Sequence, residues 1–278
     1  MNNIYLVTVA THSQGYFPIL KESCKRQNAE LIVLGYNEKW KGFAWRFELV
    51  RNFLKTLNGN DIVVFIDAFD VILLNNLSII KERFIEKNTP ILFSKDGDPG
   101  DPIFKYLARR VFPQCNNINI NAGCYMGYVN GLIMMFDRIY SINGSKINDD
   151  DDDQRLFISL CKDDFFKKNI KIDTEQNIFL NILPKHLLTT EILFTSKDGK
   201  ILNKDGNEPC VIHAPGNGDL NEIAFMYGYE LAEIQKFNFI QGAKDRAVLY
   251  TRYFHLELMI VTIVILFIIS IFIFKRNK

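Results

Sequence analysis

The chain of 278 residues is long enough for one large domain or two small ones, with ample length to bury a core. Its 33 lysine and arginine residues nearly balance its 32 aspartate and glutamate residues, so its net charge gives no reason to expect nucleic acid as a partner. Five scattered cysteines without a CxxC pair argue against a disulfide framework or a zinc site, and we expect them to be reduced thiols.

The N-terminal half of the chain alternates between strand and helix patterns. Runs of apolar and β-branched residues predict strands over residues 4–10, 29–36, 61–66 and 90–94. Apolar residues at helical spacing predict helices over residues 17–26, 43–57 and 77–87. This alternation predicts a doubly wound nucleotide-binding fold, although no GxGxxG motif follows the first strand.

The second half has weaker patterns. Residues 119–129 mix small and aromatic side chains, and a helical pattern follows over residues 131–142. The turn signals KDGK and KDGN predict a hairpin, and a short strand at 209–213 runs into a loop rich in glycine and proline. Residues 222–253 are expected to form a closing helical segment and a linker.

The C-terminal segment is apolar enough to span a membrane. Between Leu258 and Phe274 only Thr262 and Ser270 are polar, and with the residues before it this run reaches the roughly 20 residues that a transmembrane helix requires. We therefore expect one transmembrane helix over residues 254–274 that anchors the protein in a lipid bilayer.

The two ends of the chain bear on the orientation of this anchor. A basic tail, residues 275–278, follows the apolar run, and the N-terminus lacks the pattern of a signal peptide. The expectation is a single-pass membrane protein with a C-terminal anchor and its large domain in the cytosol. Two Asn-x-Ser sequons, at Asn76 and Asn143, favour the alternative, in which the domain is lumenal.

Two acids follow the most apolar strand. Ligands of parallel sheets bind at the carboxyl ends of the strands, where Asp67 and Asp70 stand. If the strand ends at Ile66, a turn can bring both carboxylates to one point, where they would hold a hard cation such as Mn²⁺ or Mg²⁺. His213 ends another strand and is a candidate third ligand. The plainer alternative is a turn aspartate, a helix N-cap and a structural histidine.

Two further segments are candidates for contact with a substrate. Asn121, Gly123 and Gly127 would let a sugar approach the backbone closely, and the backbone of the loop after His213 would approach phosphate oxygens. The acid run Asp149–Asp153 leads into an amphipathic pattern, so its last members would sit at a helix N-terminus, where the macrodipole favours them. A solvated or disordered acidic patch is the alternative for this run.

Five blocks together carry a family resemblance. They are FIDAFDVIL, INAGCYMGY, DDDDDQRLF, IDTEQNIFLNI and VIHAPGNG, and their order resembles that of the glycosyltransferase domain of procollagen lysyl hydroxylases and of related viral and bacterial glycosyltransferases. The resemblance covers residues 4–221. It implies a GT-A domain over residues 1–221, an α/β fold with a Rossmann-like, mixed and mainly parallel sheet flanked by helices. It also implies Mn²⁺ as cofactor and a UDP-sugar, galactose or glucose, as donor.

The resemblance also implies roles for individual residues. The metal ligands would be Asp67, Asp70 and His213. The catalytic, acceptor-side residues would be Asp152, Asp153 and Gln154. The substrate-binding residues would be Thr8, Arg46, Phe69, Asn121, Gly123, Asp173, Gly216, Asn217 and Gly218, with Phe69 stacking near uracil.

The chain departs from the family pattern in three places. Only Gly42 remains of a glycine-rich stretch before the metal strand, two residues intervene after His213, and residues 95–118 differ from the family's acceptor-gating loop. The expected function is hexosyl transfer from a UDP-sugar to a hydroxyl acceptor, either hydroxylysine of a collagen-like protein or a glycan. The alternatives are an inactive binding or scaffold protein and a phosphohydrolase of nucleotide sugars.

Overall fold

The computed structural model describes residues 2–97, 102–144, 147–182, 194–195, 199–216, 218–230, 259–260 and 262–266. The chain divides into two units, Met1–Gln235 and Lys236–Lys278. The first unit contains every candidate site residue, so the expected domain of residues 1–221 lies within it.

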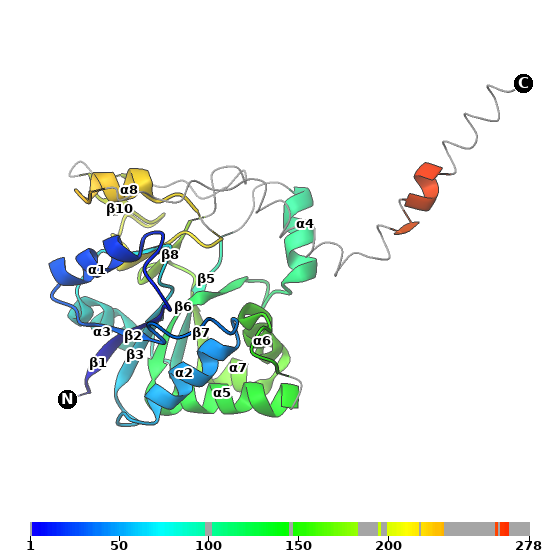
Figure 1. The fold of residues 1–278 in the computed structure, drawn as a ribbon, viewed down its shortest axis with the longest axis horizontal. Coiled ribbons are helices and arrows are strands. Elements are labelled where there is room, and N and C mark those ends of the chain that lie inside the picture. The colour runs from blue at the N-terminus through cyan, green and yellow to red at the C-terminus, as the bar shows by residue number, and fades with distance from the viewer. Residues whose placement is uncertain are drawn as a thin grey trace, which may run out of the picture. The chain divides into compact units, whose positions relative to one another are not determined.

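A mixed sheet of six described strands forms the centre of the first unit (Figure 1). In spatial order the strands are β2 (Leu31–Leu34), β1 (Ile4–Val9), β3 (Ile62–Ile66), β6 (Ile120–Tyr128), β5 (Ile91–Lys95) and β7 (Ile170–Asp173). β1 pairs in parallel with β2 and β3, as does β5 with β7, whereas β6 runs antiparallel to both β3 and β5. The expected α/β fold with a mixed, mainly parallel sheet is confirmed.

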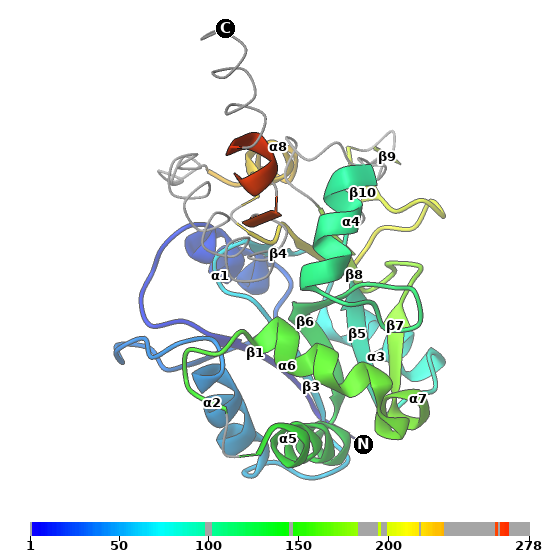
Figure 2. The ribbon, with the colours of Figure 1, turned by 90° about the vertical axis from the view of Figure 1, so that its right-hand side faces the viewer.

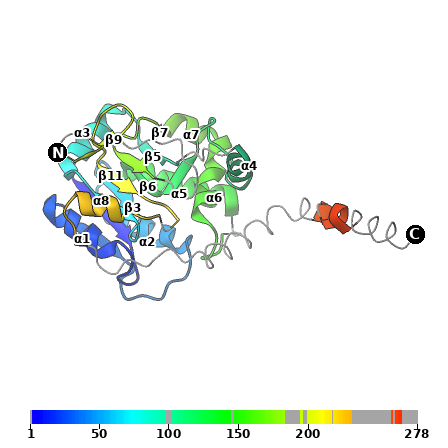
Figure 3. The same ribbon diagram turned by 90° about the horizontal axis from the view of Figure 1, so that it is seen from above.

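Helices cover both faces of this sheet. One face packs against α2 (Trp45–Leu54), α5 (Val129–Asn143), α6 (Asp153–Ser159) and α7 (Asp164–Asn169), which Figure 2 shows together. The other face packs against α1 (Phe17–Arg26) and α3 (Leu77–Glu86), seen apart from that group in Figure 3. Large apolar side chains fill both layers, so the main sheet is buried on its two faces as a parallel sheet requires.

A smaller sheet lies beyond the carboxyl end of β3. Its order is β4 (Val71–Leu73), β11 (Val211–His213) and β8 (Phe179–Asn181), with β11 antiparallel to β4 and parallel to β8. A third apolar cluster packs it against α8 (Asn221–Met226). The expected hairpin is present as β9 (Phe194–Thr195) and β10 (Ile201–Leu202), which pair antiparallel.

Several described elements were not predicted from the sequence, among them α7, β7 and β8 and the three that follow here. β4 follows the acid pair directly, α4 (Pro102–Val111) occupies the segment without a clear pattern, and β6 spans the mixed segment 119–129. The glycines of β6 weaken the strand pattern in its sequence, but the strand needs them for close packing. A Cβ on Gly127 would lie 2.7 Å from the carbonyl oxygen of Pro90.

One expectation about the cysteines was wrong. Cys115 and Cys161 form a disulfide, whereas Cys24, Cys124 and Cys210 are free and buried. A tight turn with both Asn116 and Asn117 at positive φ follows Cys115, and the 3-10 helix η2 (Leu160–Lys162) carries Cys161. The pairing was missed because these two segments are far apart in sequence and only the packed fold brings them together.

The predicted membrane segment lies mostly outside the described residues. Within it, residues 259–260 and 262–266 are helical, and their apolar side chains, such as Ile260 and Leu266, are exposed. Among the residues that the structure describes, no helix is both long and apolar enough to cross a membrane.

Candidate active site

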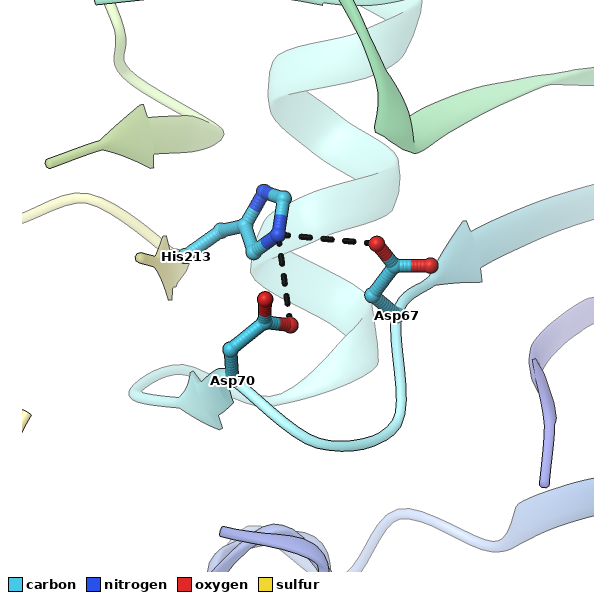
Figure 4. A group of neighbouring side chains, drawn as sticks. All are labelled: Asp67, Asp70 and His213. Carbon is cyan, nitrogen blue, oxygen red and sulfur yellow. Dashed lines mark ion pairs between the residues drawn. The ribbon is translucent and has the colours of Figure 1, made fainter. Parts of the chain in front are cut away.

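Two short strands bring the predicted metal ligands to one point (Figure 4). β3 ends at Ile66, and the Asp67 N–H donates to the carbonyl oxygen of Gly123 at 2.7 Å, which fixes the start of the turn. Asp70 then opens β4, and His213 closes the neighbouring strand β11. The His213 Nε2 atom lies 3.6 Å from Oδ2 of Asp67 and 3.3 Å from Oδ1 of Asp70. One ligand atom from each of the three residues lies within 4.8 Å of the others.

A glycine leaves the space for this cluster. A Cβ added to Gly123 would lie 2.4 Å from Cε1 of His213 and 2.5 Å from Oδ2 of Asp67. Any larger residue in the middle of β6 would therefore displace two of the three ligands. Gly123 was expected to make room for a sugar, and the described contacts show it making room for the ligand side chains.

A buried asparagine fixes the tautomer of the histidine. The Nδ2 group of Asn181 donates to the carbonyl oxygen of Lys95 at 2.6 Å, so its Oδ1 atom is the acceptor that faces Nδ1 of His213 at 2.8 Å. His213 Nδ1 must then carry a proton, which leaves Nε2 as the atom directed at the two aspartates, and its lone pair is available to a cation once Nε2 is deprotonated. Nε2 has no other hydrogen-bond partner among the described residues, and the side chain is 1% exposed. This is the arrangement that a metal-ligating histidine requires.

Burial and neighbouring charge shift the pKa values of the cluster. Burial raises the pKa of Asp70, although the His213 ring opposes this effect. Burial lowers the pKa of His213, but the Asp70 and Cys124 side chains outweigh it and raise that pKa well above its usual value. Two carboxylates and a histidine with a free lone pair form a donor set that suits Mn²⁺ or Mg²⁺, so the residues present fit the implied cation.

Arg46 joins the metal cluster to the acid run. Its side chain is 8% exposed, and its two terminal nitrogens donate to Asp67 and to Asp153 in ion pairs. Burial by itself lowers the pKa of Arg46, but Asp153 and Asp67 raise it above its ordinary value, so the guanidinium stays charged. The ring centroids of Phe43 and Phe65 lie 5.3 and 5.6 Å from the guanidinium carbon of Arg46, so both rings pack against its charged group.

The last acids of the run begin α6, as predicted. Asp152 is the N-cap and accepts from the Arg155 N–H at 3.1 Å, and Asp153 is the first helical residue. Burial raises the pKa of both carboxyls, and Arg46 opposes the rise at Asp153 most strongly. Asp151 instead accepts from the Asn148 N–H and stays within the loop. The run is therefore held at its start by the Trp45 N–H, which donates to the Asp149 carbonyl oxygen, and at its end by α6, but only its last two carboxylates lie at the helix N-terminus.

Gln154 uses both ends of its amide on β6. Its Oε1 atom accepts from the Ala122 N–H at 2.6 Å, and its Nε2 group donates to the carbonyl oxygen of Ile120. The side chain thus ties the start of α6 to the strand that carries Asn121. Asn121 accepts from the Gly123 N–H at 2.8 Å and donates to Asp96 at 3.3 Å. Asn121 lies next to the metal cluster, because Asn121, His213 and Asp67 all surround Gly123. The roles that the resemblance implies for Asn121 and Gln154 stay predictions.

Phe69 and Thr8 are two of the residues expected to bind the substrate, and the resemblance implied that Phe69 stacks near uracil. Phe69 lies between the two metal-ligand aspartates, with the rings of His12 and Phe17 at 5.8 and 6.2 Å. Gly15 has a φ of 52° and packs so closely that a Cβ would lie 2.7 Å from the carbonyl oxygen of Phe69. Thr8 is fully buried, and its hydroxyl has no hydrogen-bond partner among the described residues.

Asp173 has a structural environment. It is fully buried, and its Oδ2 atom accepts from the N–H groups of Ile178 and Phe179 at 2.8 and 3.0 Å. Its Oδ1 atom lies 3.4 Å from Nζ of Lys87. These contacts hold the turn into β8, and none of them joins Asp173 to the metal cluster.

The loop after His213 is described in part. Gly216 is exposed with a φ of 74°, and Gly218 packs so tightly that a Cβ would lie 2.7 Å from that of Ala214. Asn217, the third predicted residue of this loop, lies outside the described residues.

Two polar residues of the site were not singled out from the sequence. Asn181 stands within the quoted block IDTEQNIFLNI as the last residue of the short strand β8, and that position is the signal that was passed over. Asp96 follows β5, and burial raises its pKa to about 6, while the Gly97 N–H and the His213 charge oppose the rise. Both follow strand ends at the same edge of the fold, as do the predicted ligands.

The fold and the site define an α/β domain with a candidate divalent-cation centre at the carboxyl edge of its sheet. The profile of the family described as PLOD GT domain matches residues 1–236. The chain therefore belongs to this family of glycosyltransferase domains, as the resemblance implied.

Individual relatives carry the same domain within longer proteins. A procollagen-lysine,2-oxoglutarate 5-dioxygenase of Drosophila melanogaster is 28% identical over 252 residues, which cover 83% of this chain and 33% of the relative. The human procollagen-lysine,2-oxoglutarate 5-dioxygenase 2 is 22% identical over 243 residues, 82% of this chain and 31% of the relative. The chain thus spans about a third of the length of these relatives.

One solved structure with a similar arrangement is a glycosyltransferase involved in the glycosylation of the major capsid of PBCV-1. It has 10% sequence identity and a TM-score of 0.45, and the match covers 81% of this chain and 98% of that one.

Proposed function

We propose that this protein transfers a hexose, galactose or glucose, from a UDP-sugar to a hydroxyl acceptor and that the reaction depends on Mn²⁺, with Mg²⁺ as the alternative cation. The observation that carries the proposal is the convergence of Asp67, Asp70 and the free Nε2 atom of His213 at one strand edge. A cation held there would neutralise the diphosphate of the departing UDP. The names of the relatives suggest hydroxylysine of a collagen-like protein as acceptor, and a glycan is the other candidate.

The protein's own residues divide the work between binding and proton transfer. Arg46 holds Asp67 and Asp153 at a fixed separation, so the metal side and the acceptor side move as one unit. Asp152 keeps one carboxylate oxygen on the helix cap and offers the other to an incoming hydroxyl. Asp152 takes the hydroxyl proton while the acceptor oxygen bonds to the anomeric carbon. The bond from that carbon to the phosphate oxygen breaks, and its electron pair leaves with UDP.

A donor screen tests this function directly. Thermal shifts with UDP-, GDP- and CMP-sugars, each with and without Mn²⁺, should single out a UDP-hexose in the presence of the metal. UDP release should then rise when a hydroxylysine peptide or a glycan is added. Equal release without any acceptor would favour a phosphohydrolase, and binding without release would favour an inactive scaffold.

We propose in addition that residues 254–274 anchor the protein in a bilayer. The exposed apolar helical residues between Met259 and Leu266 support this proposal. Deletion of residues 254–278 should release a soluble protein that still binds UDP and Mn²⁺. Retention of the truncated protein in the membrane fraction would contradict it.

The disulfide bears on which side of the membrane the domain occupies. Disulfides persist in oxidising compartments, so the Cys115–Cys161 pair favours the lumenal alternative over the cytosolic location. Acid quenching of the native protein, followed by alkylation in denaturant without reductant and mass spectrometry, should find Cys115 linked to Cys161 and three modified thiols. Five modified thiols would restore the cytosolic location.

A further inference from the structure

A buried tyrosine that belongs to none of the motifs lies against the turn of the metal ligands. Tyr16 directly precedes α1 and is 3% exposed. Its N–H donates to the carbonyl oxygen of Phe69 at 2.9 Å, and Phe69 stands between Asp67 and Asp70. The backbone of Tyr16 is thus part of the support of the metal turn.

The hydroxyl of Tyr16 reaches a second loop more than 200 positions further along the chain. It accepts from the Leu220 N–H at 2.8 Å and donates toward Oδ1 of Asp219 at 3.1 Å and Oδ1 of Asn221 at 3.2 Å. Leu220 is fully buried, so no water can take over its N–H if the hydroxyl is removed. Burial also raises the pKa of Tyr16, which keeps its hydroxyl protonated at neutral pH.

The loop 214–220, of which the structure describes every residue except 217, is therefore held at both ends. At its start the Ala214 N–H donates to the carbonyl oxygen of Asp70 at 2.9 Å, and the Gly218 N–H donates back to Ala214 at 3.0 Å. At its end Leu220 is held by Tyr16. Of its described residues Pro215, Gly216 and Asp219 reach the surface, so the exposed residues 215 and 216 lie between two fixed points beside His213.

We propose that Tyr16 is a positioning residue that orders the loop 214–220 against the metal turn, ready to bind the nucleoside diphosphate part of the donor. The inference rests on the proposed function. A loop that is ordered before binding spares the ligand the entropy of ordering it. Tyr16 contacts no reacting atom, so its hydroxyl acts on donor binding and not on the chemical step.

The test compares two tyrosine hydroxyls that each accept from a backbone N–H and donate to a side chain. Tyr227 accepts from the Ile201 N–H at 3.1 Å and donates to Glu208 at 3.1 Å, in contacts that do not involve the loop 214–220. Tyr16→Phe should raise the Kd for UDP with Mn²⁺ and the KM for the donor roughly tenfold, the loss expected when a buried N–H is left unpaired, with kcat unchanged. Tyr227→Phe should lower the melting temperature to a similar extent and leave both constants at the wild-type value.

Three results would separate the possibilities. Wild-type protein that binds no UDP would refute the proposed function itself. Wild-type binding that Tyr16→Phe leaves unaltered, or an equal rise in KM for Tyr227→Phe, would overturn the inference alone. If Tyr16→Phe does not fold, Asp219→Ala at an exposed position removes one partner of the hydroxyl and should raise the same KM by a smaller factor. An unchanged KM in that variant would also overturn the inference.

Discussion

The protein contains two groups of aspartates that are held in different ways. Asp67 and Asp70 lie at the two ends of a short turn between the fully buried strands β3 and β4, and both carboxylates face His213. The run Asp149–Asp153 starts in an exposed loop whose backbone accepts from the Trp45 N–H, and only its last two side chains belong to the first turn of α6. The comparison shows that a count of carboxylates predicts little. What matters is which backbone holds each carboxylate and which partner it faces.

The largest effect is expected at the three candidate metal ligands, Asp67, Asp70 and His213. His213→Ala and Asp70→Ala each remove one ligand atom of three, so each should abolish Mn²⁺-dependent UDP binding in isothermal titration calorimetry. Asp61→Ala is the control, because Asp61 is also buried but accepts from the Asn3 N–H at the other edge of the sheet. Unchanged Mn²⁺ affinity in His213→Ala would remove the histidine from the site.

The acid run should show a gradient. Asp152→Asn and Asp153→Asn should lower turnover about a hundredfold or more, the range for a positioned acid or base, and Asp149→Asn and Asp150→Asn should be nearly silent. UDP and Mn²⁺ binding should survive at Asp152, because no metal ligand is lost.

A matched cap distinguishes catalysis from helix capping in that scan. Asp163 caps α7 by accepting from the Phe165 N–H at 2.8 Å, just as Asp152 caps α6. Asp163→Asn should retain full turnover. Equal turnover in all the aspartate variants would contradict the assignment of the run Asp149–Asp153 to the active site.

The residue behind the histidine should have a smaller effect. Asn181→Ala removes the acceptor of the Nδ1 proton and frees the ring, which should weaken Mn²⁺ binding by about 10- to 100-fold. Asn203→Ala removes another buried asparagine, whose Nδ2 group donates to Glu175 at 2.9 Å. It should lower the melting temperature without changing Mn²⁺ affinity. Equal affinities in the two variants would show that Asn181 does not orient the ligand.

The smallest effect concerns stability and pH. The pKa of Asp96 is about 6 in the folded protein and about 4 in the unfolded chain, so the folded state binds more protons between these values. The stability that this carboxyl contributes is complete below pH 4 and is lost as the pH rises through 6. In metal-free buffer Asp96→Asn should therefore be more stable than wild type by about 1–3 kcal/mol at pH 7.5. The two should unfold alike at pH 4, and a gain of equal size at both pH values would contradict the assignment.

Local patterns predicted most elements of the N-terminal half. The apolar runs of β1, β3 and β5 and the helical spacing of α1 and α3 depend on neighbours in sequence, and the structure has them with nearly the predicted bounds. The strand β6 escaped because Gly123 and Gly127 are dictated by groups that approach from other parts of the chain. Hydrophobic periodicity reports only on neighbours in sequence, so it cannot predict these long-range contacts.

The site followed the same division. Asp67, Asp70 and His213 each end or follow a recognisable strand, so a rule about strand ends brought them together. Other contacts of the site join residues far apart in sequence, and only the packed fold reveals them. They are the ion pair of Arg46 with Asp153, the hydrogen bonds of the Gln154 amide to β6 and the contact of Asn181 with His213. The disulfide between Cys115 and Cys161 belongs to the same class.

The antiparallel course of β6 has a practical consequence for protein engineering. Because β6 starts at the end of the sheet where β3 and β5 finish, the candidate site residues gather at that end, and turns such as the one before β3 lie at the other end. Asn60 is exposed in that turn, a full strand length from the metal ligands. It offers a place to attach a fluorescent reporter or a surface tether while the reaction edge stays open.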